Sequence, residues 1–117
     1  MTIAIQQAMN EIERLWNSFN RAVYEDGDVD AAMAATHDEC VLVNVPVGVA
    51  ADDRDGLRRY LAADVIPNVP DDLEFKRVAR TLDQRRLVEE TTVSFTHDRA
   101  LPWLLPGAAP THRRAEV

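Results

Sequence analysis

Apolar residues recur every three or four positions along the first part of the chain, as they do on the buried face of an amphipathic helix. Met9, Ile12, Phe19 and Val23 follow this spacing, and polar residues occupy most of the positions between them. We expect the helix to end near Gly27, because glycine readily adopts the left-handed conformation that follows a helix.

Two further helices are predicted by the same kind of pattern. The alanine-rich segment 29–37 follows Asp28, a residue type that often caps the start of a helix. A third helix is expected to begin after Asp52 or Asp53 and to close at Pro67. Its apolar face would hold Leu57, Tyr60, Leu61 and Val65.

The remaining apolar segments have the composition of strands. Residues 40–48 are predicted to form one strand that is bounded by Pro46 and Gly48. Residues 72–82 and 84–97 are predicted to pair as a long antiparallel hairpin, and residues 111–117 to begin another strand. We therefore expect one α+β domain over residues 1–117, in which helices cover one face of a curved antiparallel sheet.

Composition and charge narrow the classes of function. The chain has 117 residues, of which 46% are hydrophobic, and its formal net charge is −7. An acidic surface repels phosphate backbones, so we expect no nucleic-acid binding. We also expect no membrane segment and no secretory signal, and therefore a cytoplasmic protein. The single cysteine, Cys40, cannot form an intrachain disulfide and is interpreted as a buried structural thiol.

Strand alternation identifies the first candidate residues for chemistry. If the second hairpin strand is regular, Glu89 and His97 lie on the same face as Val93 and Phe95. A carboxylate in an apolar pocket and a histidine can both exchange protons near neutral pH, so both are candidate catalytic residues. Their separation along the strand is about 26 Å, too far for a direct pair. The alternatives are a solvated Glu89 and a His97 that hydrogen-bonds to the following loop.

Three polar side chains are candidate ligand contacts. Asn44 lies among valines in the middle of a predicted strand, where asparagine is unfavourable. It could orient the carbonyl or hydroxyl group of a ligand, or it could hold the turn at Pro46. Tyr24 and Tyr60 occupy apolar-facing helical positions, where each could bring a phenol to a pocket or simply pack in the core.

The proline-rich segment 95–110 is the most unusual part of the sequence. Trp103, Leu104 and Leu105 stand between Pro102 and Pro106, and we expect an extended apolar plug that shapes the rim of a pocket or packs on a second copy. His97 and Asp98 lie at the base of this loop, so Asp98 and Trp103 are also candidate ligand contacts. The histidines are scattered and no phosphate-binding or dinucleotide motif is present, so we expect neither a metal nor a cofactor.

The order of the elements resembles the nuclear transport factor 2-like superfamily, and in particular its SnoaL-like branch, which is related to polyketide cyclases of bacteria. The resemblance covers the whole chain and is carried by the first helix with Trp16 and Phe19, by HDECVLVNVPVG (37–48) and by residues 95–117. It implies a cone-shaped sheet around an apolar pocket, and a homodimer formed through the outer face of the sheet. Related chains continue into further strands that often carry a catalytic acid. This sequence ends at Val117, before those strands, so no residue in it corresponds to that acid. The alternatives left open are a naturally short chain and a part of a longer one that includes the last strands of the cone.

Two functions are compatible with this resemblance, because the superfamily contains both enzymes and binding modules. One is cofactor-independent acid–base chemistry, such as isomerisation, cyclisation or hydrolysis, on a hydrophobic carbonyl compound. The other is a non-catalytic module for ligand binding or dimerisation. His97 and Asn44 around one shared cavity would favour the enzyme. A His97 bonded to the loop, with Trp103 filling the cavity, would favour the module.

Overall fold

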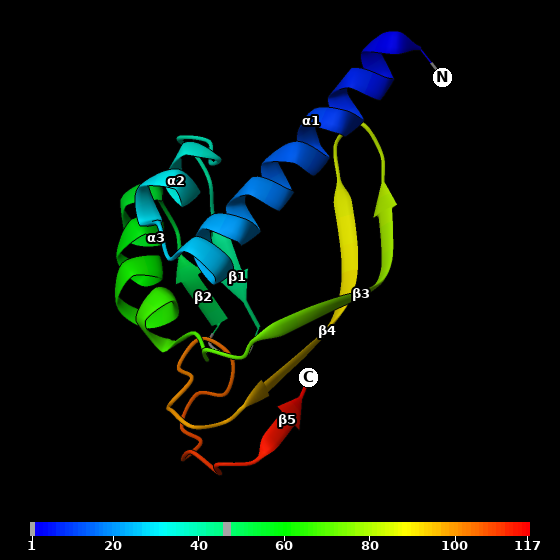
Figure 1. Ribbon diagram of the computed structural model, residues 1–117. Helices are drawn as coiled ribbons and strands as arrows, with labels where there is room; N and C mark the ends of the chain where they lie inside the picture. The colour runs from blue at the N-terminus through cyan, green and yellow to red at the C-terminus, as the bar shows by residue number, and fades with distance from the viewer. Residues whose placement is uncertain (1, 46–47) are drawn as a thin grey trace.

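The amino-terminal third of the chain is helical, as the periodicity predicts. The computed structural model in Figure 1 describes residues 2–45 and 48–117. Helix α1 (Ile3–Asn20) continues into one π-helical segment, η1 (Arg21–Asp26). Gly27 ends it with a φ of 60°, and the Asp28 carboxylate caps α2 (Val29–Ala34) by accepting a hydrogen bond from the Ala31 amide at 3.0 Å. The predicted stop and cap are both confirmed.

The third helical segment also follows its predicted boundaries closely. Asp53 is the cap, and it accepts a hydrogen bond from the Gly56 amide at 2.6 Å. The segment consists of α3 (Arg54–Tyr60), η2 (Leu61–Val65) and the single 3₁₀ turn η3 (Ile66–Asn68), so the chain stays helical for one residue beyond Pro67. Leu57, Leu61 and Val65 are buried, which confirms the predicted apolar face.

The prediction of one strand over residues 40–48 is wrong. This part of the chain forms β1 (Leu42–Asn44), which pairs in antiparallel fashion with β2 (Gly48–Ala51). Asn44 lies opposite Gly48, whose φ of 79° is in the region that favours glycine. Gly48, which the sequence predicts to bound a single strand, therefore lies at the reversal of a hairpin. The alternative role of Asn44, holding the turn at Pro46, is not tested, because Pro46 lies outside the described residues.

The long carboxy-terminal hairpin is confirmed. Strands β3 (Glu74–Leu82) and β4 (Leu87–Thr96) pair in antiparallel fashion, and β5 (Arg114–Glu116) adds to the other edge of β4. The Asp83 carboxylate closes the turn by accepting hydrogen bonds from the amides of Arg85 and Arg86, both at 2.7 Å. The pairing of β3 shifts by one residue at Val78, so the hairpin contains a β-bulge there.

The observed fold is α+β, but the sheet is not strongly curled. The expected curved sheet is instead a long hairpin with one short third strand, and Figure 1 shows α1 running along one side of this hairpin. Side-chain hydrogen bonds from Arg80 of β3 to Glu13 and Asn17 of α1 hold the two elements together.

The core lies at the end of the molecule where the helices meet the carboxy-terminal part of β4 and the loop that follows it. Its fully buried members include Val23, Met33, Phe95 and Leu101. Helix α1 itself contains no fully buried residue over its described length, Ile3–Asn20. Within the described residues, no helix is long and apolar enough to cross a membrane.

Candidate functional site

Four of the residues selected from the sequence line one cavity. Tyr24, Asn44, Tyr60 and Trp103 surround a space of about 400 Å³ between α1 and η1, β1, the α3–η2 segment and the loop after β4. Most of the remaining lining is apolar and comes from Trp16, Phe19, Leu42, Val43, Val45, Leu61, Val65 and Leu104, with Asn20 as the other amide. A volume of this size is within the range of small-molecule sites.

Asn44 connects two sides of this cavity. Its side-chain Nδ2 donates a hydrogen bond to the backbone carbonyl of Trp103 and lies 3.2 Å from the hydroxyl oxygen of Tyr60. These bonds join β1 to the loop after β4 and to α3. They use the NH₂ group of the amide, so the carbonyl oxygen of Asn44 and the hydroxyl hydrogen of Tyr60 remain for another partner.

Tyr24 forms the aromatic part of the wall. Its ring lies 5.6 Å from the ring of Trp103 and 4.9 Å from that of Phe75, both in tilted arrangements. Burial, together with the nearby Tyr60 phenol, raises the pKa of Tyr24 to about 12. The phenol is therefore a neutral hydroxyl at physiological pH and cannot serve there as a base.

Trp103 is only 7% exposed, and its indole Nε1 donates to the backbone carbonyl of Asn68 at 3.1 Å. The expectation of an extended segment is wrong, because residues 101–105 form a compact turn. The amides of Leu104 and Leu105 both donate to the carbonyl of Leu101, at 3.1 and 2.8 Å. The prolines restrict the backbone without preventing a turn, and the turn buries both Leu101 and Trp103.

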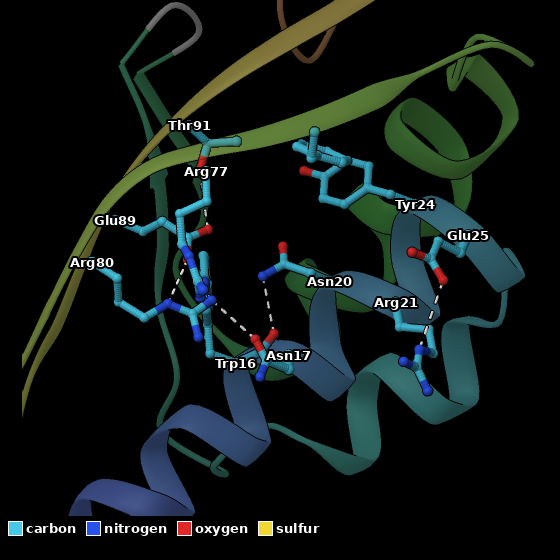
Figure 2. A pocket seen from close by; sticks show the side chains of 11 residues that line it. Trp16, Asn17, Asn20, Arg21, Tyr24, Glu25, Arg77, Arg80, Glu89 and Thr91 are labelled. Carbon is cyan, nitrogen blue, oxygen red and sulfur yellow. Dashed lines mark hydrogen bonds and ion pairs between the residues drawn. The ribbon is translucent and has the colours of Figure 1, made fainter.

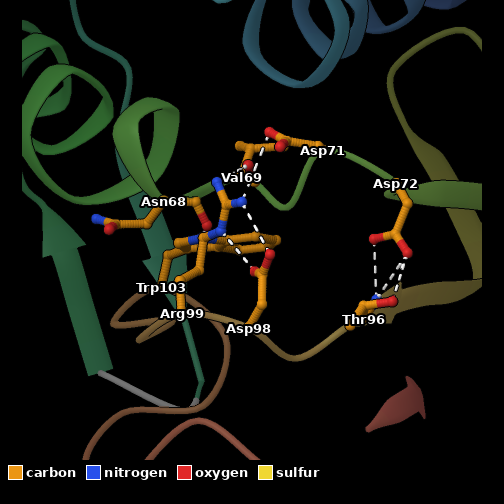
Figure 3. A network of polar contacts seen from close by, with 8 residues as sticks. All are labelled: Asn68, Val69, Asp71, Asp72, Thr96, Asp98, Arg99 and Trp103. Carbon is orange, nitrogen blue, oxygen red and sulfur yellow. Dashed lines mark hydrogen bonds and ion pairs between the residues drawn. The ribbon is translucent and has the colours of Figure 1, made fainter. Parts of the chain in front are cut away.

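Asp98 lies outside the cavity lining, in the polar network shown in Figure 3. Its carboxylate accepts from the Nε of Arg99 at 2.8 Å, and Arg99 also donates to the Val69 carbonyl at 3.0 Å. The Arg99 hydrogen bond is the main reason that the pKa of Asp98 is lowered. In the same view, Asp72 binds the amide and hydroxyl of Thr96 at the end of β4.

His97 is 3% exposed and belongs to the base of the loop. Its amide donates to the carbonyl of Arg113, its carbonyl accepts from the amide of His112, and its Nδ1 lies 3.3 Å from the Thr111 hydroxyl. Its Nε2 is buried without a hydrogen-bond partner among the described residues. His97 is absent from the lining of the Asn44 cavity, so the structure does not bring these two residues together there.

Glu89 is held in an ion-pair cluster. Arg80, directly opposite on β3, donates from Nε to Glu89 Oε2 at 2.7 Å and also pairs with Glu13 at 2.9 Å. Burial raises the pKa of Glu89, but the hydrogen bonds and charge of Arg80 and the hydroxyl of Thr91 outweigh burial, so the pKa lies below its ordinary value. Glu89 is thus a carboxylate at neutral pH.

Sequence reasoning missed Arg80 and its neighbour Arg77. Both residues face a second hollow, the α1–hairpin groove, which has a volume of about 650 Å³ and is shown in Figure 2. The spacing of three residues between them would place them on opposite faces of a regular strand. No signal in the sequence indicated the bulge that brings them to the same face.

Among the described residues, no three histidine, cysteine, aspartate or glutamate side chains gather in a way that could hold a metal ion. Comparison with known proteins adds no further site. No protein-family model, curated protein or solved structure matches this chain. The candidate site is therefore defined by its own geometry.

Proposed function

We propose that this chain is a non-catalytic binding module for a small, mainly apolar molecule that carries one hydroxyl or carbonyl group. The observation that supports this proposal is the position of Asn44. Its amide is anchored between Tyr60 and the Trp103 carbonyl, on the wall of a cavity whose other lining groups are largely apolar. A few fixed polar groups in an apolar cavity are typical of sites that bind small molecules.

The available polar groups indicate how the ligand would be held. The Tyr60 hydroxyl can donate, the Asn44 carbonyl can accept, and the neutral Tyr24 phenol can do either. A ligand carbonyl would take a hydrogen bond from a phenol, and a ligand hydroxyl would donate to the amide oxygen of Asn44. The aromatic rings of Tyr24 and Trp103 would cover its apolar body.

Acid–base catalysis is the less favoured of the two functions. His97 is bonded at the base of the loop and lies outside the cavity lining, and Glu89 is neutralised by Arg80. A general acid or base must reach the group whose proton it exchanges. Neither residue is placed to reach a ligand that contacts Asn44.

The assignment to the SnoaL-like branch of the nuclear transport factor 2-like superfamily is part of the same proposal. It is supported by the order of helices and strands and by a cavity between helices and strands. A homodimer is proposed on the same basis. A dimer interface could bury the exposed apolar side chains of Val41, Val43 and Val88.

The neutral fluorescent probe N-phenyl-1-naphthylamine tests the cavity. Its emission should rise on binding to the wild-type chain. Val43 is 60% exposed on the cavity rim, so Val43→Trp should narrow the entrance and lower the binding of the probe. Val117→Trp makes the same change at a 55% exposed position outside this cavity, and it should leave binding unchanged.

The proposal fails if the wild-type chain does not bind the probe, or if Val117→Trp impairs binding and Val43→Trp does not. Turnover of a carbonyl compound that is lost in His97→Gln would instead support the enzyme.

A further inference from the structure

The α1–hairpin groove differs in character from the Asn44 cavity. Polar and charged side chains dominate its lining, and they come from α1 and η1 on one side and from β3 and β4 on the other. In Figure 2, Arg77 and Thr91 lie on the hairpin side, and Asn20 and Tyr24 on the helix side. The rings of Trp16, Tyr24 and Phe75 supply the apolar part of the groove.

The three guanidinium groups of the groove are not equivalent. Arg80 is paired with Glu13 and Glu89, and Arg21 lies 3.7 Å from Glu25. Arg77 forms no ion pair with any residue in the ranges 2–45 and 48–117. The groove therefore holds one exposed cation that has no carboxylate of its own.

The bulge at Val78 creates this arrangement. Arg77 lies opposite Thr91 and Arg80 lies opposite Glu89, and both pairs face the groove. Without the extra residue, strand alternation would turn one of the two arginines to the other side of the hairpin. Bulges commonly redirect side chains in this way next to binding sites.

We infer that the groove binds a planar, apolar monocarboxylate, with the carboxylate at Arg77 and the apolar body against the aromatic rings. A guanidinium matches the geometry of a carboxylate and can bind it through two parallel hydrogen bonds. Asn17 uses its amide oxygen to accept from Arg80, which leaves its NH₂ group as a second donor. This inference goes beyond the proposed function and does not depend on the Asn44 cavity.

The charges also favour a single negative charge on the ligand. The Arg80 cluster contains two carboxylates and one guanidinium, so it carries one excess negative charge, and its Arg80 and Glu89 line the same groove as Arg77. A dianion such as phosphate would be attracted by the Arg77 guanidinium, but the excess negative charge of this cluster would repel it more strongly than it repels a monoanion. The whole chain, at −7, gives no long-range attraction for anions, so selectivity has to come from the local contact.

Two probes of the same shape test the inference: 2-naphthoate, which is anionic, and 2-naphthamide, which is neutral. Binding to the full chain is measured by amide chemical-shift titration, which also locates the ligand. The wild type should bind 2-naphthoate more tightly, with the largest shifts at Arg77, Thr91 and Asn17. Replacing Arg77 by glutamine should weaken 2-naphthoate binding about five- to tenfold, as expected for a charged hydrogen bond at a partly exposed site. Binding of 2-naphthamide should hardly change.

Lys76 provides the matched control, because it directly precedes Arg77 on β3 and is absent from the groove lining. Lys76→Gln removes the same charge from the chain and should keep the preference for 2-naphthoate. Arg77→Lys keeps the charge and should retain part of the preference, which separates loss of the contact from loss of the fold.

Equal binding of the two probes by the wild type would overturn the inference. So would a preference that persists in Arg77→Gln, or one that Lys76→Gln removes equally. Shifts confined to Tyr60 and Leu104 would place the probe in the Asn44 cavity, which would overturn the groove as the site. Val43→Trp should leave 2-naphthoate binding unchanged, so failure of the proposed function remains distinguishable from failure of this inference.

Discussion

Arg80 and Glu89 occupy opposite positions on β3 and β4, and Arg80 donates to Glu89 at 2.7 Å across the hairpin. The same guanidinium reaches α1, where it binds Glu13 at 2.9 Å and Asn17 at 3.0 Å. Arg80 is only 12% exposed and Glu89 16%, so water replaces these bonds poorly if one partner is lost. Because α1 buries none of its described residues fully, this cluster is a principal attachment between the helix and the hairpin.

The first prediction concerns the acidic member of this cluster. Glu89→Gln should lower the free energy of unfolding at pH 7 by about 1–3 kcal/mol, the range for hydrogen bonds to charged groups. The folded pKa of Glu89 lies below its ordinary value of 4.5, so the ionised form stabilises the fold above that pH, and this stabilisation is lost as the pH falls through the folded pKa. Urea unfolding at pH 7 and pH 3 measures both effects, and the difference between variant and wild type should shrink at pH 3.

Glu90→Gln is the control for that experiment, because Glu90 is exposed and its side chain points to the other face of β4. It should change stability by less than about 0.5 kcal/mol. Equal effects of the two substitutions would mean that the Arg80 cluster does not attach α1.

A second prediction follows from the indole of Trp103. Trp103→Phe keeps an aromatic ring but removes the hydrogen bond to the Asn68 carbonyl and leaves unfilled volume in the core. We expect a loss of about 1–3 kcal/mol in the free energy of unfolding. Thermal or urea unfolding measures it, with Trp16→Phe as the comparison. Trp16 is 38% exposed, so its replacement should have the smaller effect. The reverse order would contradict the role of Trp103 in holding the loop.

A third prediction concerns the ionisation of Tyr24. In an alkaline titration followed by ultraviolet absorbance, Tyr24 should ionise near pH 12, well above the ordinary value of 10.0. Because the folded pKa is raised, stability should fall as the pH rises from about 10 towards 12. Tyr24→Phe should abolish the late absorbance step and flatten this fall. A Tyr24 that ionises near pH 10 would show that the phenol is open to water.

Local pattern predicted the faces of the elements well. The alternation in β4 placed Glu89 and Phe95 on one side, and the helical spacing identified the buried face of α3 and η2, because both depend only on the backbone period. The helix caps at Asp28 and Asp53 could also be predicted from the sequence, because each carboxylate accepts a hydrogen bond from an amide only three residues later.

The partners of these side chains could not be read in the same way. Nothing near Glu89 in the sequence indicates that Arg80 will neutralise it and will also bind Glu13, because the Glu13 contact depends on where α1 crosses the hairpin. The side chain of His97 contacts the Thr111 hydroxyl in the loop that follows β4. It does not line the cavity that contains Asn44. The bulge at Val78, which creates the groove, has no glycine or other residue that marks it.

The last prediction tests the wall of the Asn44 cavity. In Asn44→Asp, an ionised carboxylate would have only acceptors, so it could no longer donate to the carbonyl of Trp103. We expect a loss of about 1–3 kcal/mol in the free energy of unfolding at pH 7. The folded state disfavours the charged form, so the folded pKa of the new carboxyl should be raised, and stability should return as acid protonates it and restores a donor. Asn44→Leu should lose the same bonds at every pH, so urea unfolding of both variants at pH 7 and pH 4.5 separates the charge from the missing amide. An Asn44→Asp chain as stable as the wild type at pH 7 would mean that this amide does not join β1 to the Trp103 loop, and the binding proposal would lose its main support.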